Sequence, residues 1–192
     1  MPNIQIPAGL VDANIEFFNH DWEPMATFQG RVMHLLDLPE ETLEILHSDL
    51  NRNVPAKYSL LLSGIHDPID QLKKYIACKF GGFDNAPDVV DGQLGSSELH
   101  DCGFRGVCPM EGIVCGTLRV NEHVISPFEI QMIHELATEK TLPAIAEILK
   151  VSINTFETRK KILFEKLNVF SRARLVAVCF EKQILTPLSC SA

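Results

Sequence analysis

The strongest apolar periodicity of the chain lies in its last third and predicts four short helices. The first begins at Ser126, which forms the sequence of a capping box with Glu129. The second begins at about Leu142 and repeats apolar residues at i, i+3, i+4 and i+7. Ser152 is expected to cap the third helix, and the fourth starts after Ser171. Two short helices joined by a tight turn, the second of them basic, are typical of a helix-turn-helix.

The third of these helices, residues 152–168, has one apolar side and one polar side. At about 100° per residue, Phe156, Leu163 and Leu167 fall on the same side and are expected to face the core. Polar residues near the N-terminus of such a helix are the best placed to reach base edges in a major groove. The opposite side of the helix carries Asn154, Glu157, Thr158, Lys161 and Glu165.

The chemistry of this region predicts two kinds of DNA contact. Thr158 and Lys161 can donate hydrogen bonds to base acceptors, and Glu157 can accept one from N4 of cytosine. Asn154 lies on the same side of the helix and completes this group. Contacts to phosphates are expected from Thr155, Lys160, Lys166 and Arg172.

The first 125 residues have weaker periodicity and predict a domain that is mostly helical or α+β. Residues 57–64 fit either a short strand or a buried helix. Glycine, aspartate and cysteine accumulate between residues 81 and 125, which predicts an ordered loop region. Helices are predicted at residues 10–20, 24–36, 39–51 and 67–80. The chain as a whole is therefore expected to be mainly α.

The predicted domain boundary lies near residues 121–126, where strong helical patterning restarts. The N-terminal part is expected to be a regulatory or interaction domain with a cysteine-containing loop at residues 98–116. The predicted divisions are residues 1–122 for this domain, 123–186 for the helix-turn-helix domain and 187–192 for a flexible tail.

The distribution of charge agrees with this division. The 192-residue chain has a formal net charge of −8 at pH 7, which by itself argues against nucleic-acid binding. Residues 126–184, however, carry nine Lys and Arg against seven acids, a net charge of +2. The rest of the chain carries eight basic and 18 acidic residues, a net charge of −10. Phosphate binding follows local potential, and Arg159-Lys160-Lys161 provides a basic focus.

No apolar run approaches the length of a membrane span, and residues 1–9 lack the basic start and apolar core of a signal peptide. We therefore expect a cytoplasmic protein without a membrane partner, in which the six cysteines are mostly reduced. His-Asp dipeptides follow the pattern of metal-dependent phosphohydrolases, but that chemistry needs further ligands on a larger scaffold, so we expect no enzyme.

Three cysteines, Cys102, Cys108 and Cys115, lie within fourteen residues and are separated by five and six residues. Soft thiolates in a glycine-rich loop suit zinc or an iron–sulfur cluster. Arg105 would instead suit a redox sensor by lowering a thiol pKa, and a structural role in the loop is the third interpretation. The fourth metal ligand stays open among an exogenous group and the side chains of Cys78, His100 and His123.

Residues 125–176 resemble the helix-turn-helix of the LuxR/GerE family, with its features in the same order and without gaps. The resemblance implies a four-helix domain whose third helix enters the major groove and whose fourth helix often mediates dimerisation. The matching features are Ser126-Pro127 with Glu129, Ile145-Ala146, Ser152, Thr155, Lys166-Leu167, Val169, and Ser171-Arg172-Ala173 with Leu175. The sequence departs from the family pattern at Glu157, Arg159 and Ile162, which leaves the operator sequence unpredicted.

The sequence therefore predicts a bacterial transcriptional regulator that binds double-stranded DNA as a homodimer and reads the major groove with residues 152–168. RNA polymerase is a further candidate partner. The alternatives are a sigma-factor-like promoter-binding protein and a protein-interaction adaptor built on a helix-turn-helix. The N-terminal part matches neither a phosphoacceptor receiver nor an acyl-homoserine-lactone domain, because the alternating β/α pattern of a receiver is missing and no lactone-binding domain is recognised.

Overall fold

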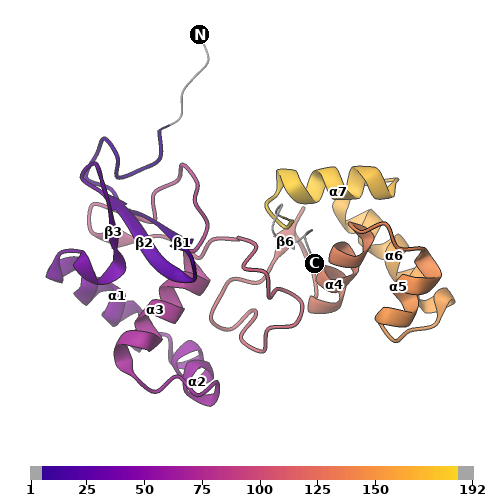
Figure 1. The fold of residues 1–192 in the computed structure, drawn as a ribbon, viewed down its shortest axis with the longest axis horizontal. Coiled ribbons are helices and arrows are strands. Elements are labelled where there is room, and N and C mark those ends of the chain that lie inside the picture. The colour runs from indigo at the N-terminus through magenta and orange to yellow at the C-terminus, as the bar shows by residue number, and fades with distance from the viewer. Residues whose placement is uncertain (1–5, 186–192) are drawn as a thin grey trace, which may run out of the picture. The chain divides into compact units, whose positions relative to one another are not determined.

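The computed structural model describes residues 6–185 (Figure 1). It divides into two compact units. Within the described residues, the N-terminal unit comprises residues 6–100 together with Gly112–Gly116, and the C-terminal unit comprises Asp101–Glu111 together with residues 117–185. The chain thus passes between the units three times, whereas the sequence predicted one boundary near residues 121–126. The predicted flexible tail lies outside the described residues.

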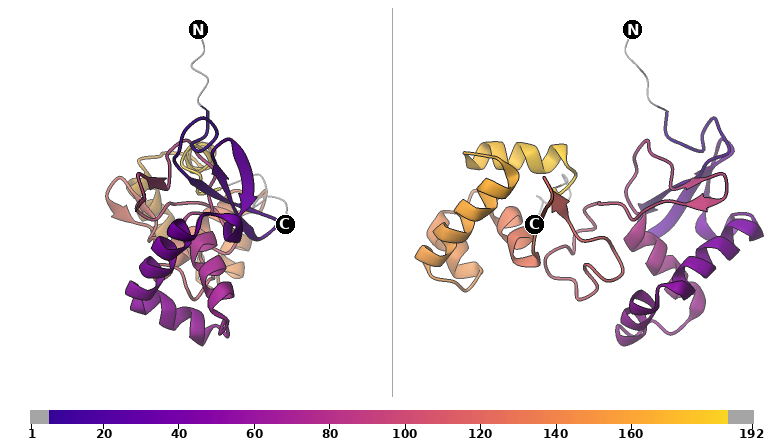
Figure 2. Two further views of the ribbon diagram at one scale, coloured as in Figure 1. Left: turned by 90° about the vertical axis from the view of Figure 1, so that its left-hand side faces the viewer. Right: turned by 180° about the vertical axis from the view of Figure 1, so that it is seen from behind.

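The N-terminal unit begins with a three-stranded antiparallel sheet rather than with helices (Figures 1 and 2). The helices predicted at residues 10–20 and 24–36 are therefore wrong. The strands pair in the order β1-β2-β3. Their bounds are Glu16–His20 for β1, Glu23–Phe28 for β2 and Arg31–His34 for β3.

Two-residue turns explain why this segment forms hairpins. Asp21 and Trp22 join β1 to β2 with φ values of 49° and 69°. Gln29 and Gly30 join β2 to β3 with φ values of 49° and 75°. Turns in which both central residues have positive φ match the right-handed twist of paired strands. Bulky residues such as Trp22 rarely adopt this conformation, so the dipeptide Asp21-Trp22 does not indicate a turn in the sequence.

Helices follow the sheet, and the two that were predicted after it are confirmed. The predictions at residues 39–51 and 67–80 correspond to α1 and α3, and the ambiguous segment at residues 57–64 is largely helical. Asp67 caps α3 because its carboxylate accepts hydrogen bonds from the backbone N–H of Ile69 and of Asp70. The helices are η1 (Leu35–Asp37), α1 (Glu40–Arg52), α2 (Val54–Leu62) and α3 (Pro68–Lys79).

Helix α3 packs against β1 and β2, and its apolar side forms the core of this unit. Phe17 of β1 and Phe80 after α3 are both fully buried, with their ring centroids 6.0 Å apart. Tyr75 of α3 is also fully buried, and its hydroxyl donates a hydrogen bond to the Asp49 carboxylate at 2.6 Å. This core fixes β1 against α3.

Residues 81–125 are mostly loop, as predicted, but they contain two short hairpins. The first turns at Asp91-Gly92, a dipeptide that favours a two-residue hairpin turn. The first hairpin pairs β4 (Val89–Val90) with β5 (Gln93–Leu94), and the second pairs β6 (Arg119–Val120) with β7 (His123–Val124).

The four helices predicted for the C-terminal unit are confirmed. Ser126 forms the predicted capping box with Glu129, and Ser152 and Ser171 cap the third and fourth helices. The helices are α4 (Pro127–Leu136), α5 (Leu142–Ile148), α6 (Ile153–Leu167) and α7 (Arg172–Glu181). The described chain has seven α-helices and three small antiparallel sheets, so its content is mixed rather than mainly α. None of its described helices combines the length and apolarity of a membrane span.

Candidate nucleic-acid interface

A tight turn between α5 and α6 sets the direction of the candidate recognition helix. Lys150 adopts a left-handed conformation with φ of 55°, which ends α5 within one residue of its C-cap. The backbone N–H of Val151 donates to the carbonyl of Ala146 at 3.0 Å. Ser152 then caps α6 by accepting a hydrogen bond from the N–H of Thr155 at 3.2 Å.

Helix α6 has the two sides that its sequence predicts. Phe156, Leu163 and Leu167 are buried in the core of the unit. The other side is open to solvent and brings together five of the predicted DNA-contacting residues, Asn154, Thr155, Glu157, Thr158 and Lys161. We call these five residues the α6 polar face.

The hydroxyl groups of the α6 polar face have local hydrogen-bond partners. Thr158 donates to the backbone carbonyl of Asn154 at 2.9 Å. The hydroxyls of Thr155 and Ser152 share a hydrogen bond at 2.8 Å. Each hydroxyl oxygen keeps further capacity for a ligand because its side chain is exposed.

The three consecutive basic residues of α6, Arg159, Lys160 and Lys161, differ in their partners. Lys160 is half-buried and pairs with Glu157 at 2.5 Å. The guanidinium of Arg159 lies over the ring of Phe128, 4.2 Å from its centroid. Lys161 is exposed and has no ion pair within residues 6–185. Its ammonium group is therefore the most available of the three for an anionic ligand.

Lys166 connects α6 to the start of α4. Its ammonium pairs with the Glu129 carboxylate at 2.7 Å and donates to the carbonyl of Val124 at 3.0 Å. Burial raises the pKa of Glu129, but hydrogen bonds from Lys166 and Ser126 outweigh it and lower this pKa below its ordinary value. The Lys166 side chain therefore has a role in the fold. Its predicted phosphate contact stays a prediction.

Substitution of Lys166 tests the two roles against each other. We expect Lys166→Ala to lower the free energy of unfolding by about 1–2 kcal/mol, because Glu129 would lose its charge partner. If the role is confined to the fold, the salt dependence of DNA binding stays as in the wild type. A salt slope reduced by about one unit, measured on the folded variant, would instead establish a phosphate contact.

Arg172 holds the end of α4 through its guanidinium group. Its Nε donates to the carbonyl of Leu136 at 2.6 Å, and its Nη1 donates to the carbonyl of Lys140 at 2.9 Å. Its Nη2 donates to the carbonyl of Thr138. The planar fork thus binds one carbonyl that the end of α4 leaves without an intrahelical partner and two carbonyls of the segment that follows α4. The predicted phosphate contact of Arg172 is also untested.

The cysteine-containing loop is shared between the units. Cys102 and Cys108 belong to the C-terminal unit and Cys115 to the N-terminal unit, and each is half-buried. Arg105, which the redox interpretation placed beside a thiol, forms a buried ion pair with Glu111 at 3.5 Å. The metal site, with zinc or an iron–sulfur cluster, stays a prediction.

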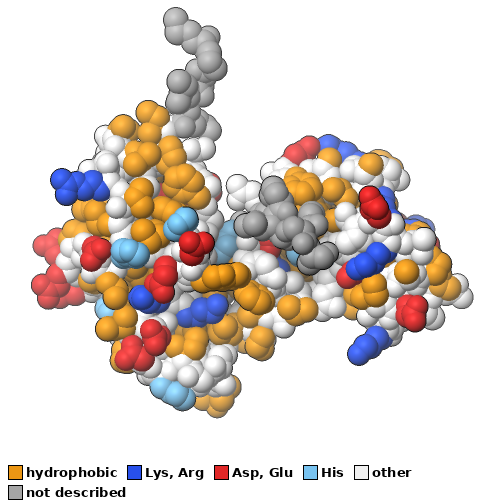
Figure 3. All heavy atoms as spheres, viewed as in Figure 1, with side chains coloured by type: hydrophobic (Ala, Val, Ile, Leu, Met, Phe, Trp, Pro, Cys, Tyr) orange, Lys and Arg blue, Asp and Glu red, His pale blue; other side chains and the backbone are white. Residues whose placement is uncertain are grey.

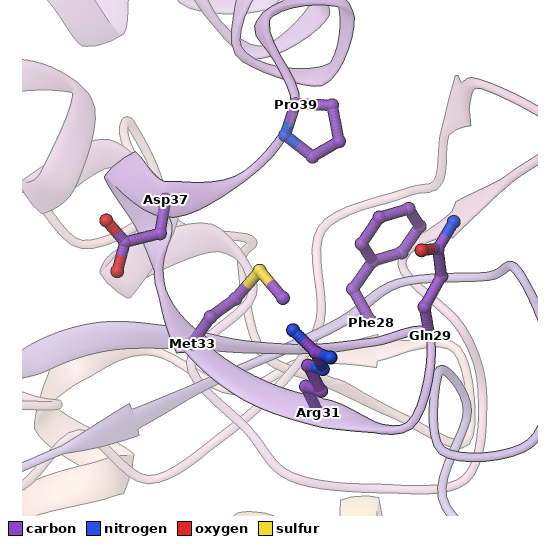
Figure 4. A pocket seen from close by; sticks show the side chains of 6 residues that line it. All are labelled: Phe28, Gln29, Arg31, Met33, Asp37 and Pro39. Atoms are coloured by element: carbon purple, nitrogen blue, oxygen red, sulfur yellow. The ribbon is translucent and has the colours of Figure 1, made fainter.

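The N-terminal unit has a pocket beside the sheet (Figure 4). Its lining combines apolar surface with one cation and one carboxylate. Figure 4 shows the Asp37 carboxylate pointing away from Arg31. The pocket is lined by Phe28, Gln29, Arg31, Met33, Asp37 and Pro39.

Surface charge differs between the two units. Figure 3 shows acidic side chains gathered over the N-terminal unit, and Lys and Arg interleaved with acids on the visible face of the C-terminal unit. This pattern agrees with the net charges of the two sequence segments, +2 for residues 126–184 and −10 for the rest. Local potential favours a nucleic-acid contact on the C-terminal unit.

Comparison with protein families identifies the C-terminal segment. Residues 123–179 match the family model described as bacterial regulatory proteins, luxR family. The matched segment runs from β7 through most of α7 and includes the whole α6 polar face. No curated protein and no solved structure matches the chain.

Proposed function

We propose, from the LuxR-family domain at residues 123–179, that the chain is a sequence-specific transcriptional regulator that reads the major groove with α6. The domain itself supports DNA binding in transcriptional regulation. The observation that carries the finer proposal is the α6 polar face, which is exposed near the N-terminus of a helix that follows a tight turn. Such a helix inserts its first turns into a major groove.

The proposal divides the α6 polar face by chemistry. Thr158 and Lys161 donate to base acceptors, while Asn154 extends the contact toward the start of the helix. Lys160 leaves Glu157 to bind a phosphate, and Glu157 then accepts from N4 of cytosine. The phosphate then compensates the Lys160 ammonium, while the Glu157 carboxylate exchanges its ion pair for a hydrogen bond from the neutral cytosine amino group.

We further propose that two copies bind a two-fold operator through their α7 helices, with half-sites about 34 Å apart. Alanines at 173 and 177 and Phe180 are exposed on α7 and provide small and aromatic contacts for such a pairing. The proposed setting is the cytoplasm, and RNA polymerase is the partner through which a bound regulator would act.

Lys161→Ala tests the role of the α6 polar face. The full chain is first used to select duplexes from a random pool, and affinities for the selected and a scrambled duplex are then measured at several salt concentrations. We expect Lys161→Ala to weaken binding to the selected duplex by about tenfold or more. The ratio between the affinities for the selected and the scrambled duplex should therefore fall. Lys160→Ala should weaken both duplexes equally, because its contact is to a phosphate.

Lys182→Ala provides a matched control, since Lys182 is exposed, lies outside the α6 polar face, and follows α7 on the side opposite the proposed pairing residues 173, 177 and 180. It should bind both duplexes as the wild type does, or show only the small loss expected from long-range charge. The proposal fails if the random pool gives no motif, or if Lys161→Ala and Lys182→Ala have the same effect.

A further inference from the structure

Three carboxylates meet inside the N-terminal unit, apart from the proposed DNA contacts. One oxygen from each of Glu16, Asp84 and Glu98 lies within 4.8 Å of the others. Glu16 belongs to β1, while Asp84 and Glu98 belong to the loop region after α3. The fold therefore brings together acids that are far apart in the sequence, and we call them the carboxylate cluster.

Glu16 is the most constrained member of the carboxylate cluster. Its side chain is fully buried, and its Oε1 accepts a hydrogen bond from the backbone N–H of Asp84 at 2.8 Å. Its Oε2 is buried without any hydrogen-bond partner. An acidic oxygen that is removed from water and left without a donor is costly, so this atom points to a missing ligand.

Among residues 6–185, no lysine or arginine forms an ion pair with any of the three members of the carboxylate cluster. A fourth acid, Asp88, is almost completely buried nearby and accepts from the N–H of Phe17 at 2.8 Å. Burial raises the pKa of Glu16 to about 8, that of Asp88 to about 9 and that of Glu98 to about 7. The site thus has a deficit of positive charge.

We propose that Glu16, Asp84 and Glu98 bind one hard divalent cation of the calcium type. Carboxylate oxygens bind Ca²⁺ at about 2.3–2.6 Å, so two oxygens on opposite sides of the ion lie about 5 Å apart. The three carboxylate oxygens of the cluster all lie within 4.8 Å of one another, which fits that span. The cation would supply the partner that Glu16 Oε2 lacks.

The surroundings favour calcium over magnesium and over zinc. Mg²⁺ binds oxygen at about 2.1 Å and keeps several waters, whereas Glu16 offers a fully buried ligand. Zinc prefers nitrogen and sulfur ligands, and the carboxylate cluster offers only oxygen. This site is therefore different from the predicted cysteine site.

A bound cation would fasten β1 to the segment between residues 84 and 98. The two are already joined by the N–H of Ile15 to the carbonyl of Val89 at 3.0 Å, and by the N–H of Asp88 to the carbonyl of Ile15 at 2.8 Å. The ion adds a charge-compensated link at the same place. The inference concerns the N-terminal unit and does not depend on DNA binding.

The test uses the full chain, stripped of metal with a chelator and then freed of the chelator. Bound Ca²⁺ is measured by equilibrium dialysis, and thermal unfolding is followed with CaCl₂, with MgCl₂ and without either. We expect one Ca²⁺ per chain and a Tm that rises by about 5–10 °C when the ion exceeds its Kd a hundredfold. MgCl₂ at the same concentration should give a smaller shift.

Glu98→Gln removes one charge but keeps an oxygen that can accept from the N–H of Gly82, as Glu98 does at 3.2 Å. We expect it to lower Ca²⁺ affinity at least tenfold without lowering the Tm of the metal-free protein. Asp84→Asn serves as a second variant if the first does not fold. Glu44→Gln, at an exposed position of α1, is the matched control and should bind Ca²⁺ as the wild type does.

Three outcomes would overturn the inference. The first is less than about 0.2 equivalents of bound Ca²⁺ at 1 mM CaCl₂. The second is an equal rise of the Tm with CaCl₂ in Glu98→Gln and in the wild type. The third is a Tm that rises with MgCl₂ but not with CaCl₂. In the first case, protons alone neutralise the carboxylate cluster.

Discussion

Arg172→Ala is expected to lower the free energy of unfolding of the C-terminal unit by about 3 kcal/mol. Its guanidinium donates to three carbonyls at and after the end of α4, and a hydrogen bond to a charged group contributes about 1.5–3 kcal/mol. The total stays below the sum because Arg172 is only half-buried, so water can replace part of the lost contacts. Thermal and denaturant unfolding of the full chain measure the effect.

Arg174 provides the control for this substitution. It lies two residues further along α7, is exposed and makes a surface ion pair with Glu181 at 2.9 Å. Arg174→Ala should cost about 0.5 kcal/mol, as is usual for exposed pairs. Equal effects of the two substitutions would mean that the three carbonyls do not depend on Arg172.

Gly9→Ala is expected to destabilise the N-terminal unit by at least about 3 kcal/mol. Gly9 has φ of 77°, and a Cβ there would overlap the backbone carbonyl of Thr27. The neighbouring backbone is fixed, since the N–H of Gly30 donates to the carbonyl of Gly9 at 2.8 Å. The added methyl group therefore has no flexible neighbour that can move aside. Hydrogen exchange of the β2 amides would report this loss directly.

Gly64 separates the effect of overlap from that of conformation. It has φ of 84°, but a Cβ there would meet nothing within 4 Å. Gly64→Ala should therefore cost only the conformational term, about 1 kcal/mol. A cost for Gly9→Ala no larger than that for Gly64→Ala would contradict the predicted overlap.

The C-terminal unit was predictable because its signals are local. Ser126 and Glu129 form a capping box across three residues, and the apolar positions of α6 repeat within one helix. The exposed side of α6 follows from the same periodicity. Local signals of this kind fix both helix boundaries and faces, and the family match agrees with them.

The N-terminal sheet was missed because its first turn and its first strand lack the usual sequence signals. Asp21-Trp22 lacks the glycine that marks a two-residue hairpin, and Phe17-Phe18 places apolar residues on both faces of β1. Without alternation, such a segment resembles part of a helix. Asp91-Gly92 has the expected turn sequence, but its strands are only two residues long.

Long-range contacts account for what the sequence did not show about the candidate sites. Lys166 and Glu129 are 37 residues apart, so periodicity within α6 showed only a basic side chain near the helix end. The backbone of Asp84 and the carboxylate of Glu16 are 68 residues apart. Pairings of this kind depend on tertiary structure, which single-sequence patterns do not encode.

The return of residues 101–111 to the C-terminal unit affects how that unit can be isolated. The Gln131 side chain donates from Nε2 to the carbonyl of Gly106 at 2.6 Å, so this loop supports α4. A truncation at residue 123, where the family match begins, would strip α4 of that contact. An autonomous DNA-binding fragment should accordingly start at about Asp101 and carry the short excursion of residues 112–116 with it.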